Sequence, residues 1–229
     1  MPTDTRPDPF APRRLAAPRI PTDLRILVPD ASDEAGDAEW TGVHVAGWRP
    51  PAGVVTTATL GFRASRLEAL DLSGLRLAGV SLVDCEVAGS NLANLEVRAG
   101  ALVRAVVRHS RLTGLTWPGG LLRDVRFEDC RVDLASLRFS RLERVSFLRC
   151  VLAEADFEGV RADSVRFADC DLTRAQFSQA HFERSEIRHC DLARVSGVTG
   201  LRGVGLLPAD ILGLAGSLAA ELGLRTLDE

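Results

Sequence analysis

The chain has 229 residues but no tyrosine and no lysine, and only 5% of its residues are aromatic. All 28 basic residues are therefore arginine. They face 31 acidic residues, which leaves a formal net charge of −3. So few rings favour a thin core over a wide one. Without a basic excess or a basic stripe, direct binding of nucleic acid is not expected.

Targeting signals are also lacking. No apolar run is long enough to span a bilayer, so no membrane association is expected. The first residues, MPTDTRPDPFAPRR, lack the apolar segment of a signal peptide. The five cysteines fit buried, unpaired thiols in a reducing compartment. These features predict a cytoplasmic protein.

A bulky apolar residue recurs at every fifth position from Leu67 to Leu192. Leu, Val, Phe or Ile fills 24 of these 26 positions, and the residue two places earlier is small in 22 of 26. A period of five matches neither a helix, at about 3.6, nor a strand, at 2. The chain must therefore turn a corner every five residues, with one large and one small side chain per side pointing into a narrow tube.

This pattern resembles the pentapeptide-repeat family, whose consensus is roughly Ala-Asp/Asn-Leu-X-X. The best matches are ADFEG at 155–159, CDLTR at 170–174 and CDLAR at 190–194, within a repeat over 65–194. The resemblance implies an all-β solenoid, a right-handed quadrilateral β-helix with four five-residue sides per coil. On that geometry, the repeat over 65–194 makes about six and a half coils.

Like residues recur at intervals of 20, as such a coil requires, and we expect them to stack in the core. Cysteine is interpreted here as a small apolar residue, because a line of thiols does not converge on a metal ion. The predicted core columns are Phe127, Phe147 and Phe167; Phe157 and Phe177; and Cys130, Cys150, Cys170 and Cys190.

Four regions are expected along the chain. Residues 1–20, rich in Pro and Arg, predict a disordered arm. Residues 21–64 contain short strand-like runs outside the five-residue pattern and predict an N-terminal β cap. Residues 65–194 form the β-helix. Residues 195–229 predict a helical cap, which is also a candidate dimer contact.

Two local features leave alternatives open. A helix beginning at Pro208 either covers the last coil or, as the resemblance implies, serves a homodimer. Residues 117–119 form either a distorted corner or a loop that contacts a partner. The apolar stripe of the helix comprises Leu207, Ile211, Leu214, Leu218 and Leu222. The corner or loop comprises Trp117, Pro118 and Gly119.

No catalytic motif, metal-ligand spacing or phosphate-binding loop is found, so we expect a non-enzymatic protein without a cofactor. Related quinolone-resistance proteins are understood to imitate duplex DNA and bind type II topoisomerases. Duplex DNA is densely negative, whereas residues 65–194 carry 19 arginines and 19 acids. The first hypothesis is therefore a rigid, mixed-charge scaffold for an unidentified protein partner. The alternative is a DNA mimic that binds gyrase and confers quinolone or toxin tolerance. A third hypothesis assigns recognition to the N-terminal arm.

Overall fold

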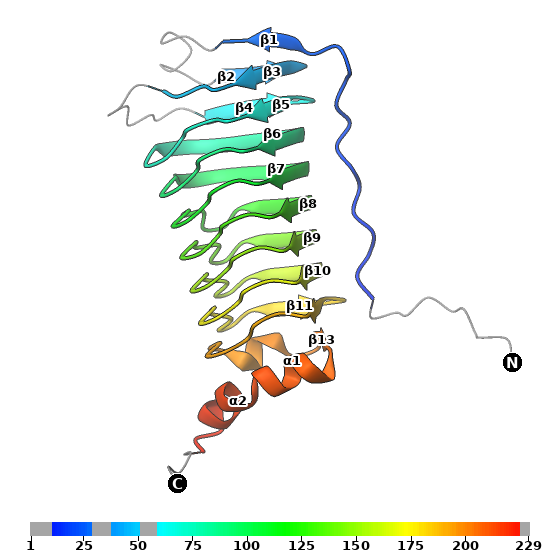
Figure 1. The fold of residues 1–229 in the computed structure, drawn as a ribbon, viewed down its shortest axis with the longest axis vertical. Coiled ribbons are helices and arrows are strands. Elements are labelled where there is room, and N and C mark those ends of the chain that lie inside the picture. Colours follow the sequence, from blue (N-terminus) through cyan, green and yellow to red (C-terminus); the bar gives the residue numbers. More distant parts are fainter. Residues whose placement is uncertain (1–10, 29–37, 51–58, 225–229) are drawn as a thin grey trace, which may run out of the picture.

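The chain forms a parallel β-solenoid of about eight turns with short helices near its C-terminal end (Figure 1). The structure is a computed structural model that describes residues 11–28, 38–50 and 59–224. The all-β solenoid predicted from the sequence is thus confirmed. Within the described residues, no helix is long and apolar enough to cross a membrane.

The strands stack in chain order in one continuous sheet. Their bounds are β1 Arg25–Leu27, β2 Ala38–Thr41, β3 Val43–Ala46, β4 Thr59–Arg63, β5 Arg66–Glu68, β6 Arg76–Ala88, β7 Glu96–Arg108, β8 Leu121–Glu128, β9 Arg141–Leu148, β10 Arg161–Ala168, β11 His181–Glu183, β12 Glu186–Arg188 and β13 Gly205–Leu206. The helices are the 3-10 helix η1, Val198–Leu201, and the α-helices α1, Pro208–Gly213, and α2, Ala215–Glu221.

From β4 to β12 each residue pairs with its counterpart one coil of four five-residue sides further on, as Leu82 does with Leu102. Corners are made by residues in the left-handed region, such as Asp84 at φ 56° and Arg104 at φ 51°. A single left-handed residue redirects an extended chain without ending its pairing. Four such sides close one coil, so the inward residues recur every fifth position.

The solenoid begins earlier than the sequence predicted. Residues 38–48, expected in a cap outside the repeat, pair in parallel with later coils, as His44 does with Arg66. Arg25 likewise pairs with Val43. The interval from His44 to Arg66 is longer than a regular coil, and the interval from Arg25 to Val43 is shorter. Strand pairing requires inward apolar residues and matched backbone groups, but it does not require a constant number of residues at the corners. These irregular coils therefore still stack. The start of the predicted strand-like run at 54–62 lies outside the described residues.

The two halves of the tube are filled differently. In the C-terminal half, Phe147 stacks between Phe127 at 4.8 Å and Phe167 at 5.1 Å, measured between ring centroids. Phe157 stacks on Phe177 at 5.2 Å. The four cysteines of the predicted column are buried beside these rings. In the N-terminal half the inward residues are mainly Leu and Val. They form most of the lining of an apolar cavity of about 70 Å³, which also reaches Phe127 and Phe147.

Residues 11–24 run as an extended arm along the side of the stacked strands (Figure 1). This differs from the prediction of disorder for 1–20, whose first ten residues lie outside the described part. The physical reason is that the arm is held by the rod: its backbone donates hydrogen bonds to two carboxylates of the solenoid. Composition alone, rich in Pro and Arg, did not reveal these acceptors.

The C-terminal helix predicted from Pro208 does form, with Pro208 in its first turn, but it is broken at Leu214 into α1 and α2. Of the predicted stripe, only Leu214 is fully buried, at 3% exposure, and Leu207 is half-buried. Ile211, Leu218 and Leu222 are exposed. Because α2 starts on a new axis, the spacing of 3 and 4 residues does not place the five side chains on one buried face.

Candidate interaction surfaces

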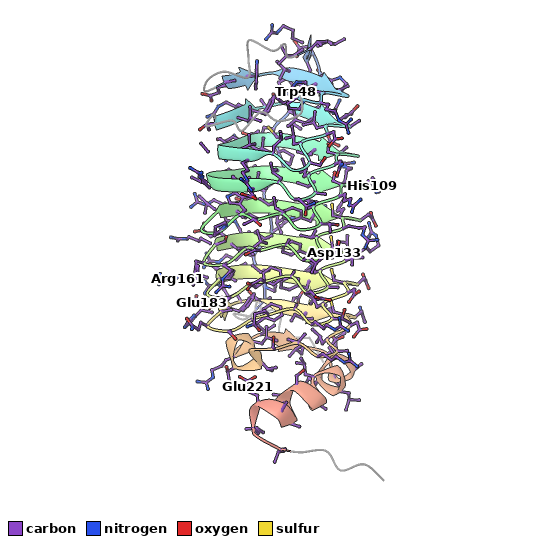
Figure 2. All side chains as sticks on the ribbon, turned by 90° about the vertical axis from the view of Figure 1, so that its left-hand side faces the viewer. Trp48, His109, Asp133, Arg161, Glu183 and Glu221 are labelled. Carbon is purple, nitrogen blue, oxygen red and sulfur yellow. The ribbon has the colours of Figure 1, made fainter. Side chains whose placement is uncertain are left out.

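Outward charges are arranged in ion-pair ladders between neighbouring coils. Arg123 Nε lies 2.7 Å from Glu143 Oε2, and Arg149 Nε lies 2.7 Å from Asp129 Oδ1. The Arg123 guanidinium lowers the pKa of the Glu143 carboxyl below its usual range, against the opposing effect of burial. Figure 2 shows side chains projecting from the rod on opposite sides, with Arg161 and Glu183 on one and His109 on the other. The ladders fix long side chains that would otherwise move.

The chemistry-bearing residues of the described part do not gather. No group of three or more His, Cys, Asp or Glu there could hold a metal ion. Burial raises the pKa of the Cys85 thiol to about 11. The imidazole Nδ1 atoms of His109 and His189 lie 4.0 and 3.7 Å from separate carboxylates on different coils. These two histidines therefore belong to the surface ladders.

The corner at residues 117–119 follows the coil and does not bulge. Trp117 is buried at 5% exposure, and Gly119 N–H donates to the carbonyl of Arg138 on the next coil at 2.8 Å. Gly120 makes room for the indole, since a Cβ there would lie 2.6 Å from Trp117 Nε1. This is the distorted-corner interpretation of the sequence, so the described geometry offers no projecting loop at this point.

One stretch of outer wall, here called the uncharged strip, carries no charge over three coils in one column and over two coils in the next. Its side chains are partly exposed on β6, β7 and β8, where Ser81, Ala101 and Leu121 form one column and Val83 and Val103 a second. The same columns continue beyond the strip as charged residues such as Arg141 and Glu143. The strip was not predicted from the sequence, because equal counts of arginine and acid over 65–194 say nothing about where uncharged outward residues gather.

Another wall carries the alternating corner residues Asp84, Arg104, Asp124, Arg144, Ser164 and Arg184, here called the Asp–Arg column. The guanidinium groups of Arg104 and Arg144 each hold the aspartate one coil before them through two hydrogen bonds of 2.6–2.8 Å. The arm lies against this column. Ala16 N–H donates to Asp124 Oδ1 at 3.0 Å and Arg19 N–H to Asp84 Oδ1 at 3.1 Å.

The C-terminal end of the rod is closed by two carboxylates. Asp210 of α1 accepts hydrogen bonds from the N–H groups of His189 and Cys190, both at 3.1 Å. Glu221 of α2 accepts from Val198 N–H at 2.8 Å. Earlier members of the column show the signal that could have predicted this: Cys170 N–H donates to Cys190 Sγ, so Cys190 N–H needs an acceptor beyond the last coil.

Comparison with known proteins agrees with this geometry. The family model for pentapeptide repeats matches residues 130–167 and 163–196, in eight copies over the whole match. Residues 130–196 thus match the pentapeptide-repeat family, and the regular pairing of the coils extends well beyond this segment, back to β4 and β6. None of the curated proteins matches it.

Several solved structures are similar to it at low identity. A trypsin-treated form of QnrB1, a plasmid-mediated fluoroquinolone resistance protein, is 14% identical, with 70% of this chain and 99% of that chain covered and a TM-score of 0.39. Full-length QnrB1 is 16% identical, covering 82% and 100%, with a TM-score of 0.30. HetL, a pentapeptide-repeat protein involved in heterocyst differentiation regulation from the cyanobacterium Nostoc sp. strain PCC 7120, is 17% identical, covering 70% and 75%, with a TM-score of 0.22. Similarities this low carry no argument about partners.

Proposed function

We propose that this protein is a non-enzymatic scaffold that presents a rigid outer wall to a protein partner. The observation that carries the proposal is the uncharged strip on a wall that is otherwise organised into ion-pair ladders. Backbone hydrogen bonds between coils hold this wall in a single shape before any partner arrives. A preformed surface loses little conformational entropy on binding, which favours affinity.

The strip fits a partner whose contact surface is also uncharged. When a partner binds, the apolar surfaces of Val83, Val103 and Leu121 are removed from water, and no ion pair has to be desolvated. The flanking residues Arg63 and Arg123 then lie at the polar rim, where charges contribute mainly to orientation and association rate. This division into an apolar centre and a charged rim is typical of protein interfaces.

Partner capture from the native host, with the full chain as bait, tests the proposal. Val103→Glu places a charge in the centre of the strip and should reduce the captured partner at least tenfold. The matched control is Ala153→Glu, which adds the same charge at a partly exposed position on another side of the coil. Circular dichroism melts should show both variants folded. Equal capture by wild type, Val103→Glu and Ala153→Glu would remove this surface from the proposal.

The alternative function, a DNA mimic that binds gyrase, has less support in the described surface. Such a mimic needs unpaired negative charge along its length. Here acids of the ladders, such as Glu143 and Asp124, are paired with arginines. A gyrase supercoiling assay with and without quinolone discriminates the two functions: inhibition or protection at micromolar protein would favour the mimic over the scaffold.

Location and assembly follow as lesser parts of the proposal. Five unpaired, buried thiols suit the reducing cytoplasm. At the C-terminal end, the side chains Ile211, Leu218 and Leu222 are exposed. We propose that they form a homodimer contact. Sedimentation of the wild type against Leu222→Glu would show a concentration-dependent dimer only in the wild type if this contact forms.

A further inference from the structure

Residues 12–18 of the arm have a burial period of three residues, which does not continue to the partly buried Ile20. Pro12, Leu15 and Pro18 are partly buried against the rod, whereas the residues between them are exposed. Three residues per turn is the period of the polyproline II helix, which rises roughly 3.1 Å per residue, or about 9.3 Å per turn. Parallel strands lie about 4.8 Å apart, so two coils of the solenoid advance about 9.6 Å. One turn of the arm therefore spans two coils.

The hydrogen bonds between arm and rod have the same spacing. The two donors, Ala16 and Arg19, are three residues apart, and their acceptors, Asp124 and Asp84, lie two coils apart with Arg104 on the coil between them. Because the Asp–Arg column alternates, an aspartate faces the arm at every second coil, which is once per turn of the arm.

The two aspartates are held ready to accept these bonds. The side chains of Asp84 and Asp124 are 12% and 8% exposed, and each is bound on its inner edge by an arginine of the next coil. At the next alternate coil the column has Ser164, and Arg184 pairs with the neighbouring Asp163 instead, at 2.8 Å. Arg13, three residues before Ala16, is near enough to help lower the pKa of the Asp163 carboxyl, after the larger effect of Arg184.

The arm occupies this wall without filling it. A space of about 600 Å³ remains between residues 12–18 and the rod. Its walls are lined by Val106, Ser146, Leu148, Ala168, Arg126 and Arg166. The arm contributes mostly small residues here, including Ala16, Ala17 and Pro18. A segment with the same backbone path and larger apolar side chains at the buried positions would make more contact.

We propose that the wall along the Asp–Arg column is a binding site for a polyproline II segment of a partner protein, and that the arm is its occupant in the unbound chain. The proposal rests on the scaffold function above and names the class of partner. The segment must offer backbone N–H groups three residues apart to Asp84 and Asp124. It must also place an apolar side chain at each turn, where Pro12, Leu15 and Pro18 now lie.

The test displaces the arm without changing the site. Ala16→Pro with Arg19→Pro removes both N–H donors and keeps the extended backbone that proline prefers. Arg14→Pro with Ala17→Pro is the matched control: these residues are also three apart, also include one arginine, and donate no backbone hydrogen bond within the described part of the chain. Hydrogen exchange should show the Ala16 and Arg19 amides of the control as protected as in the wild type. The first double variant has no amide at either position, so release of its arm is measured by peptide binding.

The probe is a labelled synthetic peptide of residues 11–24, measured by fluorescence anisotropy against each full-length protein. It should bind the Ala16→Pro/Arg19→Pro protein about tenfold more tightly than the wild type or the control, because its site is vacated. A second peptide with Leu15→Phe should bind still more tightly, since it enters the unfilled space. Adding Asp84→Ala and Asp124→Ala to the arm-released protein removes both acceptors and should abolish binding of both peptides.

Equal binding of the peptide to all proteins, or binding that survives the changes of Asp84 and Asp124 to alanine, would overturn the proposal. A wild-type dimer that is lost in the Ala16→Pro/Arg19→Pro protein would also overturn it, because the occupant would then be the arm of a second copy. Failure of the peptide to bind while partner capture still depends on Val103 would remove the peptide site and leave the scaffold function standing.

Discussion

The two halves of the solenoid share one coil but pack its interior in different ways. In the C-terminal half, Phe147 and Phe157 pack edge to face, with ring centroids 6.2 Å apart, and the small inward positions hold residues such as Cys150 and Ala155. All four are at most 1% exposed. In the N-terminal half, Leu70 and Leu95 occupy the small position and the centres are Leu or Val. The two halves therefore divide the side-chain volume of each five-residue side differently between its bulky and its small inward residue. Branched aliphatic side chains of the N-terminal half form most of the lining of the 70 Å³ cavity, which borders the Phe stack at Phe127 and Phe147.

The most severe test of this comparison is Phe147→Asp. Phe147 has no exposed surface and is stacked between two rings, so a carboxylate there would be buried without a partner. We expect loss of the β-solenoid. A circular dichroism melt that matches the wild type would show that the Phe column does not hold the rod together.

Two enlargements, one at a bulky centre beside the cavity and one at a small inward position away from it, sharpen the comparison. Val107 lines the cavity, so Val107→Leu should stabilise the fold by about 0.5–1 kcal/mol by filling it. Val165 has no exposed surface and does not line the cavity, so Val165→Leu should cost about 1–3 kcal/mol through overpacking. Chemical denaturation of both variants measures the difference. The same sign for both would mean that the halves are equally well packed.

The smallest expected effect concerns the arm, which lies outside both cores. Hydrogen bonds from Arg104 and Arg144 lower the pKa values of the Asp84 and Asp124 carboxyls, and the arm's amides contribute to the same shift. A lowered folded-state pKa means that the stabilisation is complete above the ordinary aspartate value of about 4, and is lost as pH falls through the lower folded value. Arginine stays charged throughout.

Hydrogen exchange of the Ala16 and Arg19 amides, corrected for the intrinsic rate, should therefore show protection at pH 7 that disappears well below pH 4. The amides of β9 serve as the internal control and should stay protected over the same range. Protection of the arm that persists to pH 2 would mean that apolar contact, and not the aspartates, retains it.

The features that could be predicted from the sequence are those that repeat after a constant number of residues. The five-residue period predicts the tube, and the interval of four such sides predicts which residues share a column. The longer and shorter coils at the N-terminus escaped prediction because residues added or removed at a corner leave the pairing intact while they shift the count. The C-terminal stripe failed for a related reason, since a break at Leu214 changes the helix axis without changing the spacing.

The arm could not be found by the same method. Its signal is a match between two segments: Pro12, Leu15 and Pro18 at one interval, Asp84 and Asp124 at another. The two intervals predict a contact only when the rise of the coils is compared with the rise of an extended chain. The uncharged strip was within reach of the sequence, because sorting neutral outward residues by column places Ala101 beside Leu121.

The matched pitch of arm and rod restricts how such a molecule can lengthen. Duplication of a single coil beneath the arm would bring Arg104 or Arg144 to the place where an amide now meets a carboxylate. Duplication of two coils, together with one more turn of the arm, restores every contact. A rod that retains its arm should therefore grow by pairs of coils, and odd additions should release it.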